Sequence, residues 1–343
     1  MANSTKVAIL GATGESAGLI LNGLLDSKEQ HFVSKSYRFQ TLRFTETQLT
    51  ALARFSSADK PEYARLSQKG VKIAAVDLNG PEEKLVETLQ GIDVLIASVP
   101  PTVLDVQLPL IRAAKQAGVK RFLPSAYSMV IALGGVSTVQ EKKEQIYAEL
   151  ERIGLPYTII DVGWWHFGFI PRLPSGRTDY AIALPDFLIN MIPGDGNMRT
   201  CLVDNQDVGP LIARIIADHR TLNKRIIANG DALTMNELYD IVEKVTDEKP
   251  ERKYVSTEQL GVMIRDITAR IEGGMNDYRT MVGKFWLEYL YSSFITGDNS
   301  PEAAQRLGYE KALDLYPDFK PVKFEEFFRD IIRGGRRIPY SRD

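Results

Sequence analysis

The chain has 343 residues, of which 44% are apolar, so it can bury a core large enough for one large or two smaller domains. Its 42 basic and 44 acidic residues leave a formal net charge of -2, which gives no electrostatic case for a nucleic-acid partner or an anionic membrane. The single cysteine excludes an intramolecular disulfide framework, and three scattered histidines argue against a metal cluster, so we expect no metal.

The first predicted elements are a strand at 6–10, a glycine-rich turn and a helix. The turn has the pattern Gly-x-x-Gly-x-x-Ala, in which Gly11 allows a tight turn, Gly14 lets the backbone approach a phosphate and Ala17 permits close packing. A cofactor site and an ordinary strand-turn-helix both fit this motif. The alternating strands and helices that follow favour a dinucleotide with its phosphates at the helix N-terminus. The residues expected to bind it here are Gly11, Ala12, Thr13, Gly14, Glu15 and Ser16.

The second strand, at 48–54, comes later than a βαβ unit usually allows, because residues 29–47 intervene. This segment carries Lys35, Arg38 and Arg43 among aromatic residues. An extra hairpin, a partner-binding flap and an insertion are the three interpretations, and we favour the insertion.

The end of the second strand indicates which dinucleotide binds. An acidic residue there would hold the ribose 2′-hydroxyl of NAD. This chain instead has Arg54, followed by Ser56 and Lys60, which could hold a 2′-phosphate. A solvated basic loop is the alternative, and we expect NADP(H).

Strands and helices continue to alternate up to residue 162. Strands are predicted at 71–77, 93–99, 121–125 and 157–162, with helices at 81–89, 103–118 and 137–153. The strand at 93–99 is almost entirely apolar, which is typical of a central parallel strand buried on both faces. The strand ends beside the expected crevice add further cofactor-binding residues, namely Asp77, Leu78, Ser98, Val99 and Ser125.

Two neighbouring lysines flank the apolar stripe of the helix at 137–153. Lys142 and Lys143 lie about equally far to either side of the stripe, so periodicity alone does not choose between them. A lysine beside such a stripe is more often a surface residue whose charge reaches water than a catalyst.

Aromatic side chains are concentrated where the strand at 157–162 ends. Trp164, Trp165 and His166 follow at the edge where α/β sheets bind ligands, and a packed hinge between domains is the alternative. Tyr127 or His166 could polarise a substrate carbonyl.

The second half of the chain is predicted to be mostly helical. Helices are expected at 208–217, 256–271, 277–294 and 323–332, and the run Thr234-Met235-Asn236-Glu237 is a capping box that opens another. Strands near 199–205 and 225–229 are expected to return to the first sheet. We therefore predict an α/β fold with a Rossmann doubly wound parallel sheet over 1–165 that binds NADP, and a smaller, mostly helical substrate lobe over 166–343.

Several motifs together resemble the NmrA-like, isoflavone-reductase-like branch of the atypical short-chain dehydrogenases. They are the turn at 11–14, Arg54, the strand at 121–125, and the runs at 154–158 and 201–209. The resemblance implies NADPH along the strand ends and a lysine near the nicotinamide that serves acid–base chemistry. Counting thirteen residues back from Pro156 places this lysine at Lys143, which is then both a catalytic and a cofactor-binding residue.

Two departures limit what the resemblance implies. The long segment at 29–47 could disturb the adenosine end of the cofactor. The Trp164-Trp165-His166 run differs from that of the plant reductases, so their phenylpropanoid substrates are not carried over.

The function that these observations favour is an NADPH-dependent reductase of an aromatic or conjugated small molecule, in secondary metabolism. Lys143 would be catalytic, and the substrate would contact Tyr127, Trp164, Trp165 and His166. A non-catalytic NADP-sensing regulator and an isomerase on the same fold are the alternatives.

The expected location is the cytoplasm. No apolar run approaches the length of about 20 residues that spans a bilayer, and no signal segment precedes the first strand. We expect no nucleic-acid or membrane partner and leave a homodimer open.

Overall fold

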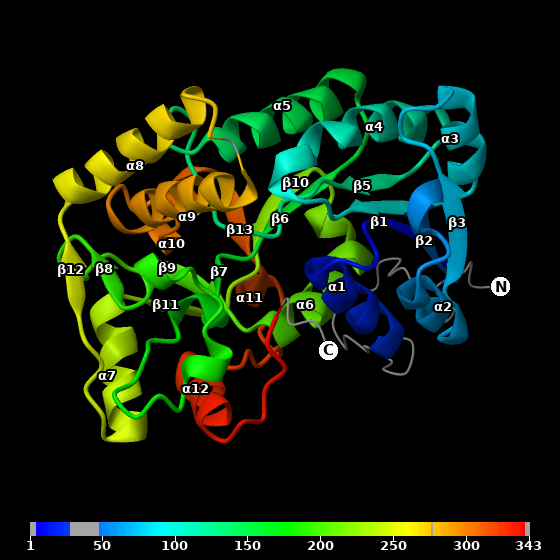
Figure 1. Cartoon of the computed structure of the whole chain (residues 1–343). Coiled ribbons are helices and arrows are strands. Elements are labelled where there is room, and N and C mark those ends of the chain that lie inside the picture. Colours follow the sequence, from blue (N-terminus) through cyan, green and yellow to red (C-terminus); the bar gives the residue numbers. More distant parts are fainter. Residues whose placement is uncertain (1–4, 28–47, 276, 340–343) are drawn as a thin grey trace. The chain divides into compact units, whose positions relative to one another are not determined.

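A computed structural model describes residues 5–27, 48–275 and 277–339 (Figure 1). The expected insertion at 29–47, with Lys35, Arg38 and Arg43, lies outside the described residues. The chain divides into two compact units. The first comprises residues 1–127, 142–161 and 208–226, and the second comprises residues 128–141, 162–207 and 227–343.

The first unit is built on a parallel sheet in the order β3-β2-β1-β4-β5. β6 extends it beside β5 through a parallel bridge between Phe122 and Tyr157, and β10 pairs with β6. The strands are β1 (Lys6–Leu10), β2 (Gln48–Arg54), β3 (Lys72–Val76), β4 (Val94–Ala97), β5 (Arg121–Leu123), β6 (Thr158–Asp161) and β10 (Lys224–Ile227). The strand order reverses between β1 and β4, and such switch points are where open parallel sheets bind ligands.

Helices cover both faces of this sheet. In Figure 1, α3, α4 and α5 lie on one face, and α1, α2 and α6 lie on the other. Their bounds are α1 (Glu15–Asp26), α2 (Pro61–Gln68), α3 (Glu82–Leu89), α4 (Gln107–Gln116), α5 (Thr138–Ile153) and α6 (Asn205–Ala217). α1 and α6 approach closely, because a Cβ added to Gly23 would lie 2.2 Å from the carbonyl carbon of Gly209.

Several of the strands and helices predicted in this part of the chain are confirmed. The strand at 48–54 is observed with the predicted bounds, and β4 is buried at all four positions, as its apolar run predicts. The predicted helix at 103–118 begins as a 3₁₀ segment, Pro101–Val106, which is kinked at Val103, and it continues as α4.

The second unit contains short strands and longer helices. Its strands are β7 (Trp164–Trp165), β8 (Met191–Pro193), β9 (Thr200–Val203), β11 (Asp231–Leu233), β12 (Lys253–Val255) and β13 (Tyr309–Lys311). Its helices are α7 (Met235–Thr246), α8 (Thr257–Glu272), α9 (Tyr278–Phe294), α10 (Pro301–Arg306), α11 (Ala312–Leu315) and α12 (Phe324–Ile332). The predicted capping box is confirmed, since Thr234 and Glu237 cap α7 reciprocally.

The strand near 199–205 differs from its expected place. It does not join the first sheet, because β9 pairs with β11 on one side and β7 on the other. Gly163, with a φ of +77°, turns the chain after β6, and a Cβ there would lie 2.4 Å from the carbonyl oxygen of Cys201. This close approach aligns Trp164–Trp165 with β9. The other returning strand, β10, does pair with β6 as predicted.

Residues near the C-terminus are anchored inside the second unit by buried charges. The Arg336 guanidinium lies 2.9 Å from the carboxylate of Asp204, and their side chains are only 4% and 0% exposed. Asp207 accepts a hydrogen bond from the backbone N–H of Val322, and burial raises the pKa of its carboxyl to about 7. α12 therefore packs into the core with its chain held at both ends.

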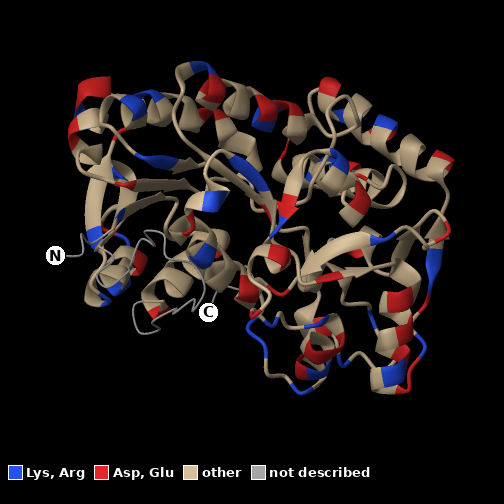
Figure 2. Cartoon of the chain, turned by 180° about the vertical axis from the view of Figure 1, so that it is seen from behind, with Lys and Arg blue, Asp and Glu red and all other residues tan. Residues whose placement is uncertain are grey.

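Charges of both signs are spread over the helices of each unit, as Figure 2 shows. Within the described ranges, no helix has the length and apolar character needed to cross a membrane.

Candidate functional site

The glycine-rich turn has the geometry of a phosphate cradle. Gly11 has a φ of +83°, and a Cβ there would lie 1.9 Å from the carbonyl oxygen of Ser98, so only glycine fits. Gly14 is the N-cap of α1, and no side chain caps it. The turn therefore leads directly into the N-terminus of α1, where the helix dipole favours an anion.

The other residues predicted in this turn have distinct environments. Ala12 and Ala17 are buried and fix the turn against the sheet. Thr13 is exposed, while Glu15 and Ser16 are half-buried in the first turn of α1. The turn thus presents backbone and small polar groups, which fits a pyrophosphate.

Exposed cations follow the end of β2. Arg54 is the last residue of the strand, and no ion pair joins its side chain to any residue in the described part of the chain. Ser56 is exposed, and Lys60 is exposed at the N-cap of α2. An exposed arginine at this edge of the sheet is suited to a phosphate.

The ends of β3, β4 and β5 complete this edge of the sheet. Asp77 is exposed and accepts a hydrogen bond from the backbone N–H of Asn79, while Leu78 is buried. Ser98 and Val99 are half-buried. The residues after β3 and the residues after β4 thus lie on opposite sides of the β1–β4 switch point, where the sequence predicts cofactor contacts.

The Ser125 hydroxyl connects the ends of two neighbouring strands. Its hydroxyl accepts from the backbone N–H of Val99 at 3.0 Å and donates to the Val99 carbonyl at 2.9 Å, so it ties the end of β4 to the end of β5. The backbone N–H of Ser125 donates to the side chain of Gln107, a buried residue that the sequence analysis did not single out. Ser125 therefore holds the crevice in shape.

The structure distinguishes Lys142 from Lys143, which helical periodicity alone could not do. Lys142 is exposed, whereas the side chain of Lys143 is only 4% exposed. The Nζ atom of Lys143 donates to the carbonyl of Ala126 at 3.4 Å and lies 3.5 Å from Oδ1 of Asp161. Lys143 thus lies at the carboxyl ends of β5 and β6, on the same sheet edge as the glycine turn.

Tyr127 lies in the same unit, just after β5. Its φ of +35° is rare for a residue other than glycine, and such strain often occurs at functional sites. The side chain is 7% exposed, and its hydroxyl has no hydrogen-bond partner among the described residues. Burial raises the pKa of this hydroxyl, so it remains a proton donor at neutral pH.

The three aromatic residues after β6 belong to the second unit. Trp164 is buried, donates from Nε1 to the Ser293 hydroxyl at 2.6 Å and stacks on Trp286. Trp165 is half-buried. The two adjacent tryptophans therefore differ. Trp164 lies in the core, and Trp165 is partly exposed.

His166 is fully buried in the second unit. Its ring packs against Phe324 and Phe327, with centroids 5.5 and 5.2 Å away. Burial, with the nearby charges of Arg336 and Lys323, lowers the pKa of His166 to about 3, so the ring is neutral at physiological pH. In this structure the residue packs the core around α12.

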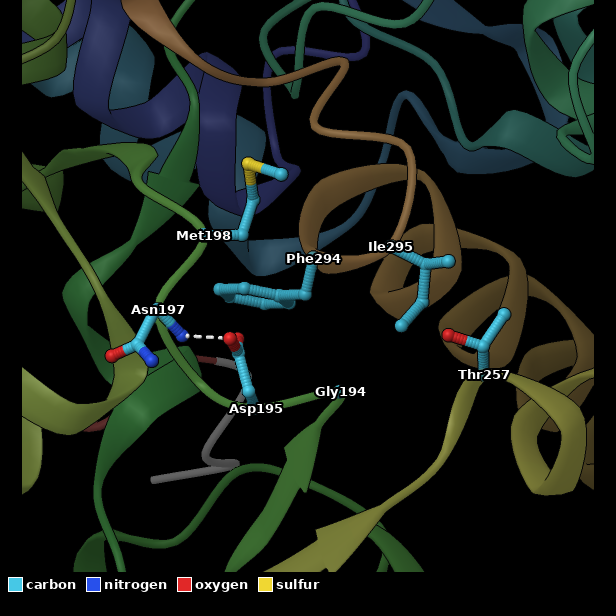
Figure 3. Close-up of a pocket in the computed structure, with 7 residues that line it drawn as sticks. All are labelled: Gly194, Asp195, Asn197, Met198, Thr257, Phe294 and Ile295. Carbon is cyan, nitrogen blue, oxygen red and sulfur yellow. Dashed lines mark hydrogen bonds between the residues drawn. The ribbon is translucent and has the colours of Figure 1, made fainter.

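A separate pocket of about 390 Å³ opens in the second unit (Figure 3). Its lining residues are Gly194, Asp195, Asn197, Met198, Thr257, Phe294 and Ile295. Asp195 accepts a hydrogen bond from the backbone N–H of Asn197, so its carboxylate is already engaged. None of the predicted site residues lines this pocket.

Comparison with known proteins shows similarity along nearly the whole chain. The family described as "NmrA-like family" matches residues 3–328. Asnovolin J 5',6'-dehydrogenase nvfM of Aspergillus novofumigatus is 37% identical over 334 residues, covering 97% of each chain. Phenylcoumaran benzylic ether reductase TP7 of Nicotiana tabacum is 26% identical and covers 97% of this chain and 100% of its own.

Solved structures give the same picture of the fold. "Crystal Structure of Isoflavone Reductase" matches with a TM-score of 0.74 and 25% identity, covering 96% of this chain and 99% of that one. "AtPrR2 with NADP+ and (+)pinoresinol" matches with a TM-score of 0.75 and 23% identity, covering 96% and 100%. The latter protein holds NADP+ in its structure.

Proposed function

This chain belongs to the NmrA-like family, and on that premise we propose that it is an NADPH-dependent reductase of an aromatic or conjugated small molecule. One observation carries the proposal. A single sheet edge in the first unit holds a glycine turn at a helix N-terminus, the exposed Arg54 and the buried Lys143. A dinucleotide along that edge would have its phosphates and its reactive end served by residues of one rigid sheet.

Each part of the edge has a chemical task. The first amides of α1 bind the pyrophosphate, and Arg54, with Ser56 and Lys60, binds the 2′-phosphate. When bound, NADPH supplies a hydride. The substrate gains negative charge as it accepts that hydride, and Lys143 donates a proton from Nζ to neutralise it. Lys143 then recovers a proton from solvent, so the substrate gains one hydride and one proton in each turnover.

Tyr127 is proposed to contact the substrate. The Tyr127 hydroxyl is buried, protonated and unpaired among the described residues, so it can donate to a substrate carbonyl. The substrate contacts expected of Trp164, Trp165 and His166, which belong to the second unit, stay predictions.

The proposal places the reaction in the cytoplasm, without a nucleic-acid or membrane partner, in a monomer or a homodimer. A single cysteine is typical of a protein that works in a reducing compartment.

The proposed function is tested by following NADPH consumption with a panel of aromatic enones and quinone methides. We expect turnover of at least one compound with NADPH and far less with NADH. Because one relative is named a dehydrogenase, the panel also pairs NADP+ with the saturated counterparts. Tight NADPH binding without turnover of any compound in either direction contradicts the proposal and supports the sensing regulator.

The cofactor preference gives a second prediction. Arg54→Ala should weaken NADPH binding by about 10- to 100-fold, because a charge-assisted hydrogen bond is worth about 1.5 to 3 kcal/mol. NADH binding should be nearly unchanged, since NADH lacks the 2′-phosphate. Titration of both cofactors by fluorescence measures the effect.

The segment 29–47 carries alternative ligands for the 2′-phosphate, namely Lys35, Arg38 and Arg43. Titrations of a variant that lacks residues 32–46 separate the two possibilities. A selective loss of NADPH affinity in that variant, or native NADPH affinity in Arg54→Ala, contradicts the role given to Arg54.

A further inference from the structure

A buried ion pair lies at the carboxyl end of β6. Asp161 is the last residue of that strand, and its Oδ1 atom lies 3.5 Å from Nζ of Lys143 on α5. The two side chains are 2% and 4% exposed. The sequence shows Asp161 only as the end of an apolar strand, and its partner lies eighteen residues earlier in the chain.

Burial of two charges is a poor means of stabilising a fold. Removing an ammonium and a carboxylate from water has a large desolvation penalty, and apolar pairs of similar volume often stabilise proteins at least as well. Active sites, in contrast, often bring buried ionisable groups together. The position of this pair, on the edge that the proposed cofactor would follow, fits the second explanation.

The backbone that carries Asp161 is held by the sheet. All four residues of β6 are buried, and the strand is paired within the sheet. The backbone N–H of Tyr127 donates to the carbonyl of Ile160 at 2.9 Å, which ties the loop after β5 to the residue before Asp161. Nζ of Lys143 therefore lies near two groups of this sheet edge, the Asp161 carboxylate and the Ala126 carbonyl.

Other charged and titratable groups also lie near this part of α5. Glu144 forms a bidentate pair with Arg225 of β10, at 2.8 and 2.9 Å, so these charges largely offset each other. Arg225 also lies over the ring of Tyr147, a buried residue of α5. Tyr127 follows β5 and is neutral. Asp161 supplies a buried carboxylate within ion-pair distance of Lys143.

We propose that Asp161 is a positioning residue that holds Nζ of Lys143 at the sheet edge before each turnover. This inference rests on the proposed role of Lys143 as proton donor. Lys143 gives its proton to the substrate as the substrate accepts a hydride, and the neutral amine then takes a proton from solvent. The Asp161 carboxylate, 3.5 Å from Nζ, and the Ala126 carbonyl, at 3.4 Å, keep this atom in place for the transfer.

The test is the steady-state kinetics of Asp161→Asn. We expect kcat to fall by about 100-fold while KM for the substrate stays nearly unchanged, because the asparagine no longer holds Nζ of Lys143 in place. NADPH affinity should remain native. Glu144→Gln is the matched control, since it breaks the neighbouring ion pair on the same helix, and its kcat should remain native.

The outcomes separate this inference from the proposed function. A native kcat in Asp161→Asn, together with an inactive Lys143→Met, overturns the role of Asp161 alone. Full activity in Lys143→Met overturns the proposed function and this inference with it. If Asp161→Asn does not fold, Asp161→Glu keeps the charge but displaces it. A kcat lowered by about 100-fold is then expected, and a native kcat contradicts positioning.

Discussion

Lys143→Met is expected to lower kcat by about 10²- to 10⁴-fold, the usual contribution of a positioned proton donor. Methionine retains most of the length and apolar character of the stem but has no proton to donate. Because Lys143 contacts the reactive end of the cofactor in the proposal, a modest change in NADPH affinity is compatible with it. Steady-state assays and a fluorescence titration of NADPH on the same preparation measure both quantities.

The neighbouring lysine supplies the control for this prediction. Lys142→Met removes the same charge from the adjacent, exposed position of α5 and should leave kcat native. Lys143→Met also removes the partner of the buried Asp161. The double variant Lys143→Met/Asp161→Asn removes both members of the pair, so it serves as the reference for correct folding. Native turnover in Lys143→Met with intact NADPH binding rules out the proposed proton donor.

Arg336→Met is expected to destabilise the second unit by about 3 to 5 kcal/mol, because it leaves a buried carboxylate without its cation. Asp204 is fully buried, and burial raises the pKa of its carboxyl even with Arg336 beside it. The guanidinium also lies over the ring of Phe327 in α12, so packing is lost as well. Urea unfolding followed by tryptophan fluorescence measures the change.

The placement of the tryptophans makes this measurement selective. All three, Trp164, Trp165 and Trp286, belong to the second unit, so fluorescence reports the unfolding of that unit. Arg333→Met is the matched control, because its side chain is 74% exposed and its ion pair with Asp330 is long, at 3.8 Å. It should change stability by less than about 0.5 kcal/mol. Equal effects of the two substitutions would show that the buried pair does not anchor the C-terminal residues.

Local patterns predict the elements of this chain well and their partners less well. The bounds of β2 and the capping box of α7 follow from signals within a few residues, namely alternation, apolar runs and the Thr234–Glu237 pair. The strand at β9 is also a correct local prediction. Its pairing with β7 and β11 is not local, because it depends on the turn at Gly163 and on the contact of that turn with Cys201.

The candidate site shows the same division. The glycine turn, Arg54 and the strand ends could be found from the sequence because parallel strands place their carboxyl ends at one edge. The choice of Lys143 over Lys142 could not be made from periodicity, since it depends on which flank of the helix meets β6. His166 was expected near the substrate, but its ring packs with α12, more than 150 residues later in the chain.

The discontinuity of the two units has a consequence for how the chain folds during synthesis. The first unit needs α6 and β10, so its sheet and the Gly23–Gly209 contact can close only after residues up to 226 have left the ribosome. The second unit needs α12 and Arg336 to complete its core and to neutralise Asp204. Until then the emerging chain exposes apolar residues of this core, and the Asp204 carboxylate remains in contact with water. Such a nascent chain would depend on chaperones for longer than one whose domains are contiguous in sequence.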